Sequence, residues 1–140
     1  MTNRNKLSVS FENARAAADA TLSAATSADG AIAVAVVDEN GDPMFMARMD
    51  GTPAADVQLA IRKAYTSAFI GRDTSFYHGQ ITKDGRTIAD WADPMITSQH
   101  GGVTLKVSGQ VIGGIGVSGT GDEDRDEQLA KTGADAASKA

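Results

Sequence analysis

The dipeptide Asn40-Gly41 constrains the fold of this chain more than any other feature. It separates two apolar runs, residues 31–38 and 43–50. An Asn-Gly pair in that setting is the strongest short-range signal for a β-hairpin, because both residues tolerate the positive φ angles of a tight turn. A two-residue turn also sets the register, so Val36 should lie opposite Phe45. We therefore expect a hairpin with one apolar face in the core.

The opposite face of this hairpin carries Met46, Arg48 and Asp50 above a floor of alanines. Residues two apart on a strand point the same way, so these three side chains should share one pocket or one interface. An arginine there could hold a ligand carboxylate, and a methionine could line an apolar ligand site. A surface ion pair and a methionine that only fills space are the plainer alternatives. We take Arg48 and Met46 as candidate ligand-binding residues and Asp50 as a candidate catalytic residue.

A second apolar stretch, residues 102–118, turns at Ser108-Gly109 and predicts another hairpin. Strict alternation divides its apolar side chains between two faces, with Val103, Leu105 and Ile112 on one and Val111, Ile115 and Val117 on the other. Both faces should therefore be covered.

The second strand of that hairpin contains a G-x-G-x-x-G spacing at Gly114, Gly116 and Gly119. A dinucleotide-binding fingerprint also needs a following helix, a second parallel strand and an acidic residue about twenty residues on. The chain ends 21 residues beyond Gly119, and residues 122–127 hold five carboxylates that would repel a pyrophosphate. We interpret the glycines as places where a helix, another subunit or a ligand approaches the backbone. Gly116 and Ser118 are kept as candidate ligand-binding residues.

Three helices are predicted around the hairpins, over residues 10–30, 52–71 and 122–140. The middle helix has Thr52 as its cap, Pro53 at its first position and Gly71 at its end. Lys63 lies beside its alanine stripe, where we expect a side chain whose stem flanks the core and whose ammonium reaches solvent. That ammonium could also pair with an anionic ligand.

Residues 72–101 show no clear periodicity and hold both histidines and the only tryptophan. We expect a long irregular segment, which in a compact domain is more often functional than idle. Histidine suits general acid–base work, although a solvated loop histidine is the plainer alternative. No H-x-x-H or H-x-x-E spacing occurs, so no metal site is predicted. The candidates in this segment are His78, His100 and Asp90 for catalysis and Tyr77 and Trp91 for ligand contact.

Length, charge and cysteine count exclude several classes of protein. The 140 residues suffice for one domain, which we place at 1–140. The absence of cysteine excludes disulfides and thiolate metal sites, and a net charge of −5 argues against nucleic-acid binding. No apolar run approaches the roughly 20 residues of a membrane span. The first residues lack the apolar core of a signal peptide, so we expect a cytoplasmic protein.

Four stretches in order resemble the GlcG-type haem-binding, or haem-degrading, domain family, which also occurs as the C-terminal domain of PduO-type cobalamin adenosyltransferases. They are AVVDENGDPMFMARMDG, RKAYTSA, GQVIGGIGVSG and DRDEQLAKTG. The resemblance covers most of the chain. It implies a profilin-like α/β (α+β) sandwich, in which an antiparallel sheet of two hairpins is flanked by N-terminal, central and C-terminal helices. It also implies a homo-oligomer, either a dimer or a higher symmetric assembly.

The function implied by this resemblance is binding of a small ligand, haem or another tetrapyrrole, in an apolar, methionine-lined pocket. Some relatives are thought to ligate haem through a histidine on the first helix, which this chain lacks. His78 or His100 would then approach the metal, and Arg48 or Lys63 would pair with the propionates.

The alternative is a small catabolic enzyme without a cofactor, such as a lyase, isomerase or hydratase. His100 or His78 would move a proton, Asp50 or Asp90 would orient it, and Arg48 would anchor a substrate oxygen. An oligomeric accessory protein without chemistry is a third possibility.

Overall fold

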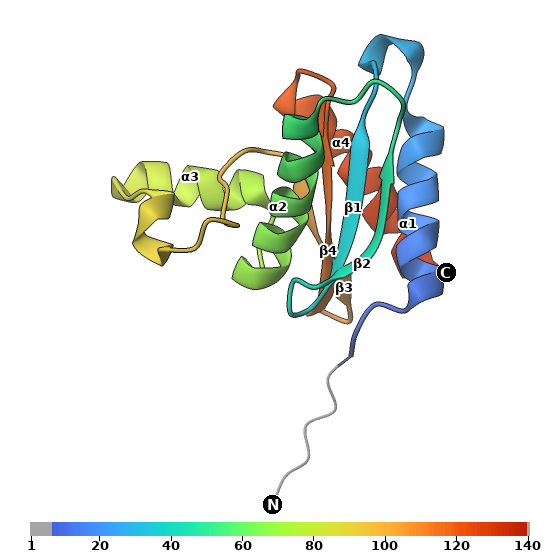
Figure 1. The fold of residues 1–140 in the computed structure, drawn as a ribbon. Coiled ribbons are helices and arrows are strands. Elements are labelled where there is room, and N and C mark those ends of the chain that lie inside the picture. Colours follow the sequence, from blue (N-terminus) through green and yellow to red (C-terminus); the bar gives the residue numbers. More distant parts are fainter. Residues whose placement is uncertain (1–6, 140) are drawn as a thin grey trace, which may run out of the picture.

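A four-stranded antiparallel sheet with the strand order β2-β1-β4-β3 organises the fold (Figure 1). The computed structural model describes residues 7–139. Both predicted hairpins are confirmed: Val36 pairs with Phe45, and Val107 pairs with Gln110 across the Ser108-Gly109 turn. The two-residue turn predicted at Asn40-Gly41 is wrong, because pairing passes from Val36–Phe45 to Val37–Pro43 through a β-bulge, and of the two turn residues only Gly41 has a positive φ. The strands are β1 (Ala33–Asp38), β2 (Pro43–Arg48), β3 (Gly102–Val107) and β4 (Gln110–Ser118).

Helices cover both faces of the sheet. Figure 1 shows α1 and α4 on one face, α2 on the other, and α3 projecting from the body beyond α2. The α-helices are α1 (Phe11–Ala24), α2 (Ala54–Ile70), α3 (Thr74–Asp84) and α4 (Glu123–Lys139), and two short 3₁₀ helices are η1 (Ser27–Asp29) and η2 (Ile88–Trp91). Within the described residues, no helix is both long and apolar enough to cross a membrane.

Local sequence signals account for the start of α1 and the end of α2. The Ser10 side chain accepts a hydrogen bond from the Asn13 backbone N–H at 3.1 Å, as expected of an N-cap. Gly71 ends α2 in the left-handed conformation, with φ at 77°. The prediction for Thr52 was wrong: Pro53 is the N-cap of α2, and the buried Thr52 hydroxyl bonds to the carbonyls of Ile32 and Met49.

A β-bulge in β4 overturns part of the predicted face assignment. Pairing passes from Lys106 opposite Val111 to Leu105 opposite Gly113, which leaves Ile112 without a partner. One extra residue shifts the alternation beyond it to the other face. Ile115 and Val117 therefore join the core under α1 and α4, on the same side as Leu105, contrary to the strict alternation.

The opposite face of the sheet is covered by α2. The alanine floor of β1 packs against an alanine stripe on this helix, so that floor forms neither a pocket nor an interface. Small side chains let the helix come close, and the glycines of β4 let it come closer. A Cβ added at Gly116 would lie 2.1 Å from the Ala60 carbonyl oxygen. The interpretation of the glycine spacing as a close approach to the backbone is confirmed, and α2 is the element that approaches.

The expectation of an irregular segment over residues 72–101 was wrong for residues 74–84, which form α3. This helix buries only Thr74, Tyr77 and Ile81, a narrow stripe at spacings of three and four residues. The rest of its surface is polar or exposed, so the hydrophobic pattern is too sparse to predict a helix. Gly85, with φ at 67°, ends α3 in the left-handed conformation.

Candidate ligand-binding site

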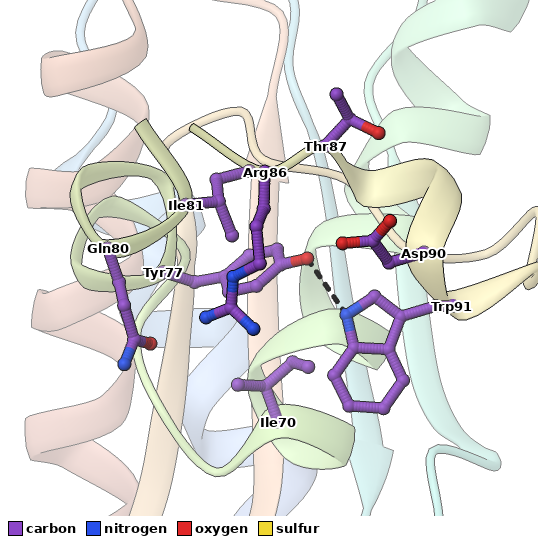
Figure 2. A pocket seen from close by; sticks show the side chains of 8 residues that line it. All are labelled: Ile70, Tyr77, Gln80, Ile81, Arg86, Thr87, Asp90 and Trp91. Carbon is purple, nitrogen blue, oxygen red and sulfur yellow. Dashed lines mark hydrogen bonds between the residues drawn. The ribbon is translucent and has the colours of Figure 1, made fainter. Parts of the chain in front are cut away.

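A cavity of about 270 Å³ lies between α3, η2 and the end of α2 (Figure 2). Its walls come from segments that are adjacent in sequence but fold back on one another. The lining residues are Ile70 of α2, Tyr77, Gln80 and Ile81 of α3, Arg86 and Thr87 of the connecting turn, and Asp90 and Trp91 of η2. Three candidates from the sequence, Tyr77, Asp90 and Trp91, are thus brought together.

Tyr77 and Trp91 form the aromatic wall of this cavity. Tyr77 is 4% exposed and shares a small apolar cluster with Ile81 and Ile96. The Trp91 indole Nε1–H donates to the Tyr77 hydroxyl at 2.9 Å, drawn as the dashed line in Figure 2. This bond pairs the polar atom of each side chain, so the rings can offer apolar surface to a ligand.

The segment that carries Trp91 is tied to α2 by further aromatic contacts. The Trp91 ring meets the Phe69 ring edge-on, with the ring centroids 5.4 Å apart. The Phe69 ring stacks on the Tyr65 ring, with the centroids 5.6 Å apart. The Tyr65 hydroxyl donates to Asp93 at 2.7 Å, and this bond, together with burial, raises the pKa of Tyr65. Tyr65 therefore stays neutral at physiological pH and holds the loop after η2 against the helix.

Arg86 supplies positive charge at the cavity. In Figure 2 its side chain lies with Tyr77 and Trp91 around the same space. Its guanidinium pairs with Asp84 at 2.9 Å, and both side chains are about half exposed. An exposed pair of this kind contributes little stability, so Arg86 can exchange Asp84 for a ligand anion at small cost.

The two histidines lie together, outside the lining of this cavity. The His78 Nδ1 donates to the Ser98 carbonyl at 3.0 Å, and the His100 Nδ1 lies 3.1 Å from the Asp124 carboxylate. The two rings meet edge-to-face with centroids 5.2 Å apart. The structure therefore separates the imidazoles from the aromatic wall.

Lys63 is buried, so the prediction of a solvent-reaching ammonium was wrong. Its Nζ donates to the Val117 carbonyl at 2.9 Å and to the Asp126 carboxylate at 3.0 Å. A buried ammonium requires such partners, because desolvating an unpaired charge is costly. In this structure Lys63 joins α2 to β4 and α4.

The remaining candidates lie on the sheet and its edge. The Arg48 guanidinium donates twice to the Thr52 carbonyl, at 3.1 and 2.6 Å, and Met46 and Asp50 are exposed. The Ser118 hydroxyl donates to Asp56 at 2.7 Å, and Gly116 lies under α2.

The acid–base alternative places His100 or His78 beside Asp50 or Asp90, with Arg48 at the same site. Asp90 lines the α3–η2 cavity, away from both histidines. The hollow that His100 faces is lined instead by Gly121, Asp122, Glu123 and Asp124. The carboxylate next to the His100 ring is that of Asp124. The site geometry therefore gives no support to the predicted catalytic grouping.

The relatives of this chain agree with the fold and direct attention to ligand binding. The model of the haem-degrading HbpS-like family matches residues 9–135. The chain belongs to this family. Protein GlcG of Escherichia coli K12 is 37% identical over 87 residues, which span 62% of this chain and 63% of GlcG, less than two thirds of that protein.

Two solved structures superimpose on most of the chain. A crystal structure of a double mutant of HbpS from Streptomyces reticuli is 30% identical, with a TM-score of 0.85 over 95% of this chain and 89% of that one. The PduOC–haem complex is 24% identical, with a TM-score of 0.82 over 93% and 95% of the two chains. At that identity PduOC shows the shared fold alone. The expected α/β (α+β) sandwich is confirmed.

Sequence reasoning missed several wall residues of the cavity in this HbpS-like chain. Ile81 lies four residues after Tyr77, and Gln80 three, so a helical reading of this segment would have placed all three on one side of α3. No local signal marks Arg86, because an exposed arginine after a glycine turn is common.

Proposed function

We propose that this chain binds a flat, apolar ligand that carries a carboxylate, of the tetrapyrrole class, in the cavity between α3 and η2. The observation that carries the proposal is the hydrogen-bonded Tyr77–Trp91 pair, which lines an apolar cavity beside a weakly paired Arg86. Membership of the HbpS-like family supports the class of ligand.

Each wall of the cavity matches one part of such a ligand. A macrocycle is flat and apolar, so it would stack on the Trp91 ring and pack against Ile70 and Ile81. Its propionate would accept charge-assisted hydrogen bonds from Arg86. A volume of about 270 Å³ is at the small end for ligand sites, so the cavity would hold an edge of the ring. The rest would lie across the half-exposed rings of Trp91 and Phe69.

Iron ligation is a separate question from binding of the ring. Ligation of the iron by His78 or His100 stays a prediction, and neither residue lines the cavity. A cavity that recognises ring and propionate should also accept a metal-free porphyrin. Comparing haem with metal-free protoporphyrin therefore separates recognition of the macrocycle from ligation of its iron.

The fluorescence of Trp91 offers a direct test, because it is the only tryptophan in the chain. We expect haem and metal-free protoporphyrin each to quench it saturably at one equivalent. Arg86→Gln should weaken binding about tenfold, the loss expected for one charge-assisted bond. Arg62→Gln, at an exposed arginine on α2 away from the cavity, is the matched control and should bind as wild type does.

Quenching that never saturates, or equal binding by Arg86→Gln and Arg62→Gln, would reject the cavity as the binding site. The visible absorption of the haem complex is recorded in parallel for His78→Ala and His100→Ala. Loss of the Soret shift in one variant, with quenching by metal-free protoporphyrin intact, would identify that histidine as the iron ligand.

We also expect this chain to assemble as a homo-oligomer, as its family resemblance implies. Phe76 is 56% exposed, and a large exposed aromatic side chain of this kind is usual at subunit contacts. Light scattering after size-exclusion chromatography measures the assembly. A monomer at all accessible protein concentrations would contradict the expectation.

A further inference from the structure

A group of side chains with metal-ligating atoms lies where the loop before β3 meets α4. His100, Asp124 and Glu127 each offer one metal-ligating atom, and these three atoms lie within 4.8 Å of one another. We propose that these residues form a binding site for a divalent transition-metal ion such as Zn²⁺. This metal site lies apart from the α3–η2 cavity, because none of the three residues lines that cavity.

Backbone contacts hold the three ligands in place. Asp122 accepts hydrogen bonds from the backbone N–H groups of Asp124 and Arg125 at 3.0 and 3.3 Å, which sets the first turn of α4. Glu127 lies three residues after Asp124, so both carboxylates face the same way. The backbone N–H of His100 donates to Glu123 at 3.0 Å, which fastens the loop to the same end of α4.

A surrounding shell of contacts orients the ligating groups. Ser75 of α3 donates to Oε1 of Glu127, and the Lys131 ammonium lies 3.9 Å from the same oxygen. The other carboxylate oxygen of Glu127 is thereby left to bind metal. The His78 ring, held by its bond to the Ser98 carbonyl, packs edge-to-face on His100. Outer contacts of this kind are typical of metal centres, where they fix ligand orientation before the ion arrives.

The donor set selects the class of metal. One imidazole nitrogen with two carboxylates suits Zn²⁺, Mn²⁺ or Fe²⁺, whereas Ca²⁺ requires about six to eight oxygen ligands. The Asp124 side chain is 78% exposed and that of His100 is 27% exposed, so water can complete the coordination. Asp122 and Glu123 line the same hollow and add negative charge that attracts a cation.

Isothermal titration of the tetrapyrrole-free protein with Zn²⁺ tests the proposal. We expect one equivalent to bind, and Asp124→Asn, Glu127→Gln and His100→Ala each to weaken binding at least tenfold, since loss even of outer-shell partners has effects of about that size. Two exposed carboxylates provide matched controls. Asp135→Asn makes the same change further along α4, Glu12→Gln makes it on α1, and both should bind as wild type does.

Proton NMR supplies a second readout, because the chain has only two histidines. The His100 imidazole signals, assigned by their absence in His100→Ala, should move on addition of one equivalent of Zn²⁺. Binding that is equal in Asp124→Asn, Glu127→Gln and the controls would overturn the proposal, as would an unmoved His100 signal. If His100→Ala fails to fold, the two carboxylate variants decide, since Asp124 is exposed and the Asn and Gln replacements keep the size of the side chains they replace.

Discussion

Replacing Gly116 with alanine tests the conclusion that the glycines of β4 exist to admit α2. The added Cβ would lie 2.1 Å from the Ala60 carbonyl oxygen and 2.5 Å from the Ala64 backbone nitrogen. Side-chain Cβ atoms essentially never approach other heavy atoms within 3.0 Å. Both obstacles are backbone atoms of a regular helix, so neither can give way alone. The helix or the strand has to move as a unit.

The cost follows from what such a movement disturbs. Lifting α2 would loosen the alanine contacts that this helix makes with β1, in which Ala33, Ala60 and Ala64 are fully buried. Overpacked core sites typically lose about 1–3 kcal/mol, and a clash with two backbone atoms of a helix belongs at the upper end. We expect a loss of about 3 kcal/mol from a total that for most domains is about 5–15 kcal/mol. For a chain of this size that corresponds to a melting temperature lower by roughly 10 °C.

Urea unfolding followed by circular dichroism measures this loss. Gly79→Ala is the control: it lies inside α3, an added Cβ meets nothing within 4 Å, and alanine favours helix by about 1 kcal/mol over glycine. We expect the two variants to shift the midpoint in opposite directions. A Gly116→Ala protein as stable as wild type would refute the close-packing argument and reopen a ligand-binding role for the glycine.

Three further predictions concern polar contacts. Lys63→Met should destabilise the fold by about 3–5 kcal/mol in urea titrations, because it removes the ion-pair partner of the buried Asp126 carboxylate. Adding Asp126→Leu removes that carboxylate as well and should recover much of the loss. A double variant no more stable than the single one would contradict this. The side-chain hydrogen bond from Arg125 holds the pKa of Asp29 far below its ordinary 3.8. The ionised Asp29 therefore stabilises the folded state fully above pH 3.8, and this contribution is lost as the pH falls below that value. Melting temperatures recorded from pH 7 to acid should therefore fall less steeply in Asp29→Asn, and equal slopes would refute the assignment. Ser10→Ala removes the N-cap of α1 and should lower stability by about 1 kcal/mol in the same urea assay, whereas an unchanged midpoint would show that the cap contributes nothing.

The sequence by itself determined the parts of the fold that depend on neighbours along the chain. Asn40-Gly41 located the first hairpin, although a β-bulge beside its turn was not predicted, and Ser108-Gly109 placed the turn of the second. Ser10 and Gly71 marked helix ends because capping uses atoms within a few residues. These signals, together with the family resemblance, were enough to predict an α/β (α+β) sandwich.

Only the tertiary structure decided which distant side chains meet. Lys63 and Asp126 form a buried pair across 63 positions, and His100 reaches carboxylates that lie 24 and 27 positions further along. The bulge at Ile112 reversed which residues of β4 face the core, and the folded-back α3–η2 segment enclosed a cavity around Tyr77 and Trp91. Turns and caps arise from the backbone angles of a few neighbouring residues. A buried charge pair, a cavity or a group of metal-ligating atoms arises from the packing of whole helices and strands, and a short sequence motif cannot predict that packing.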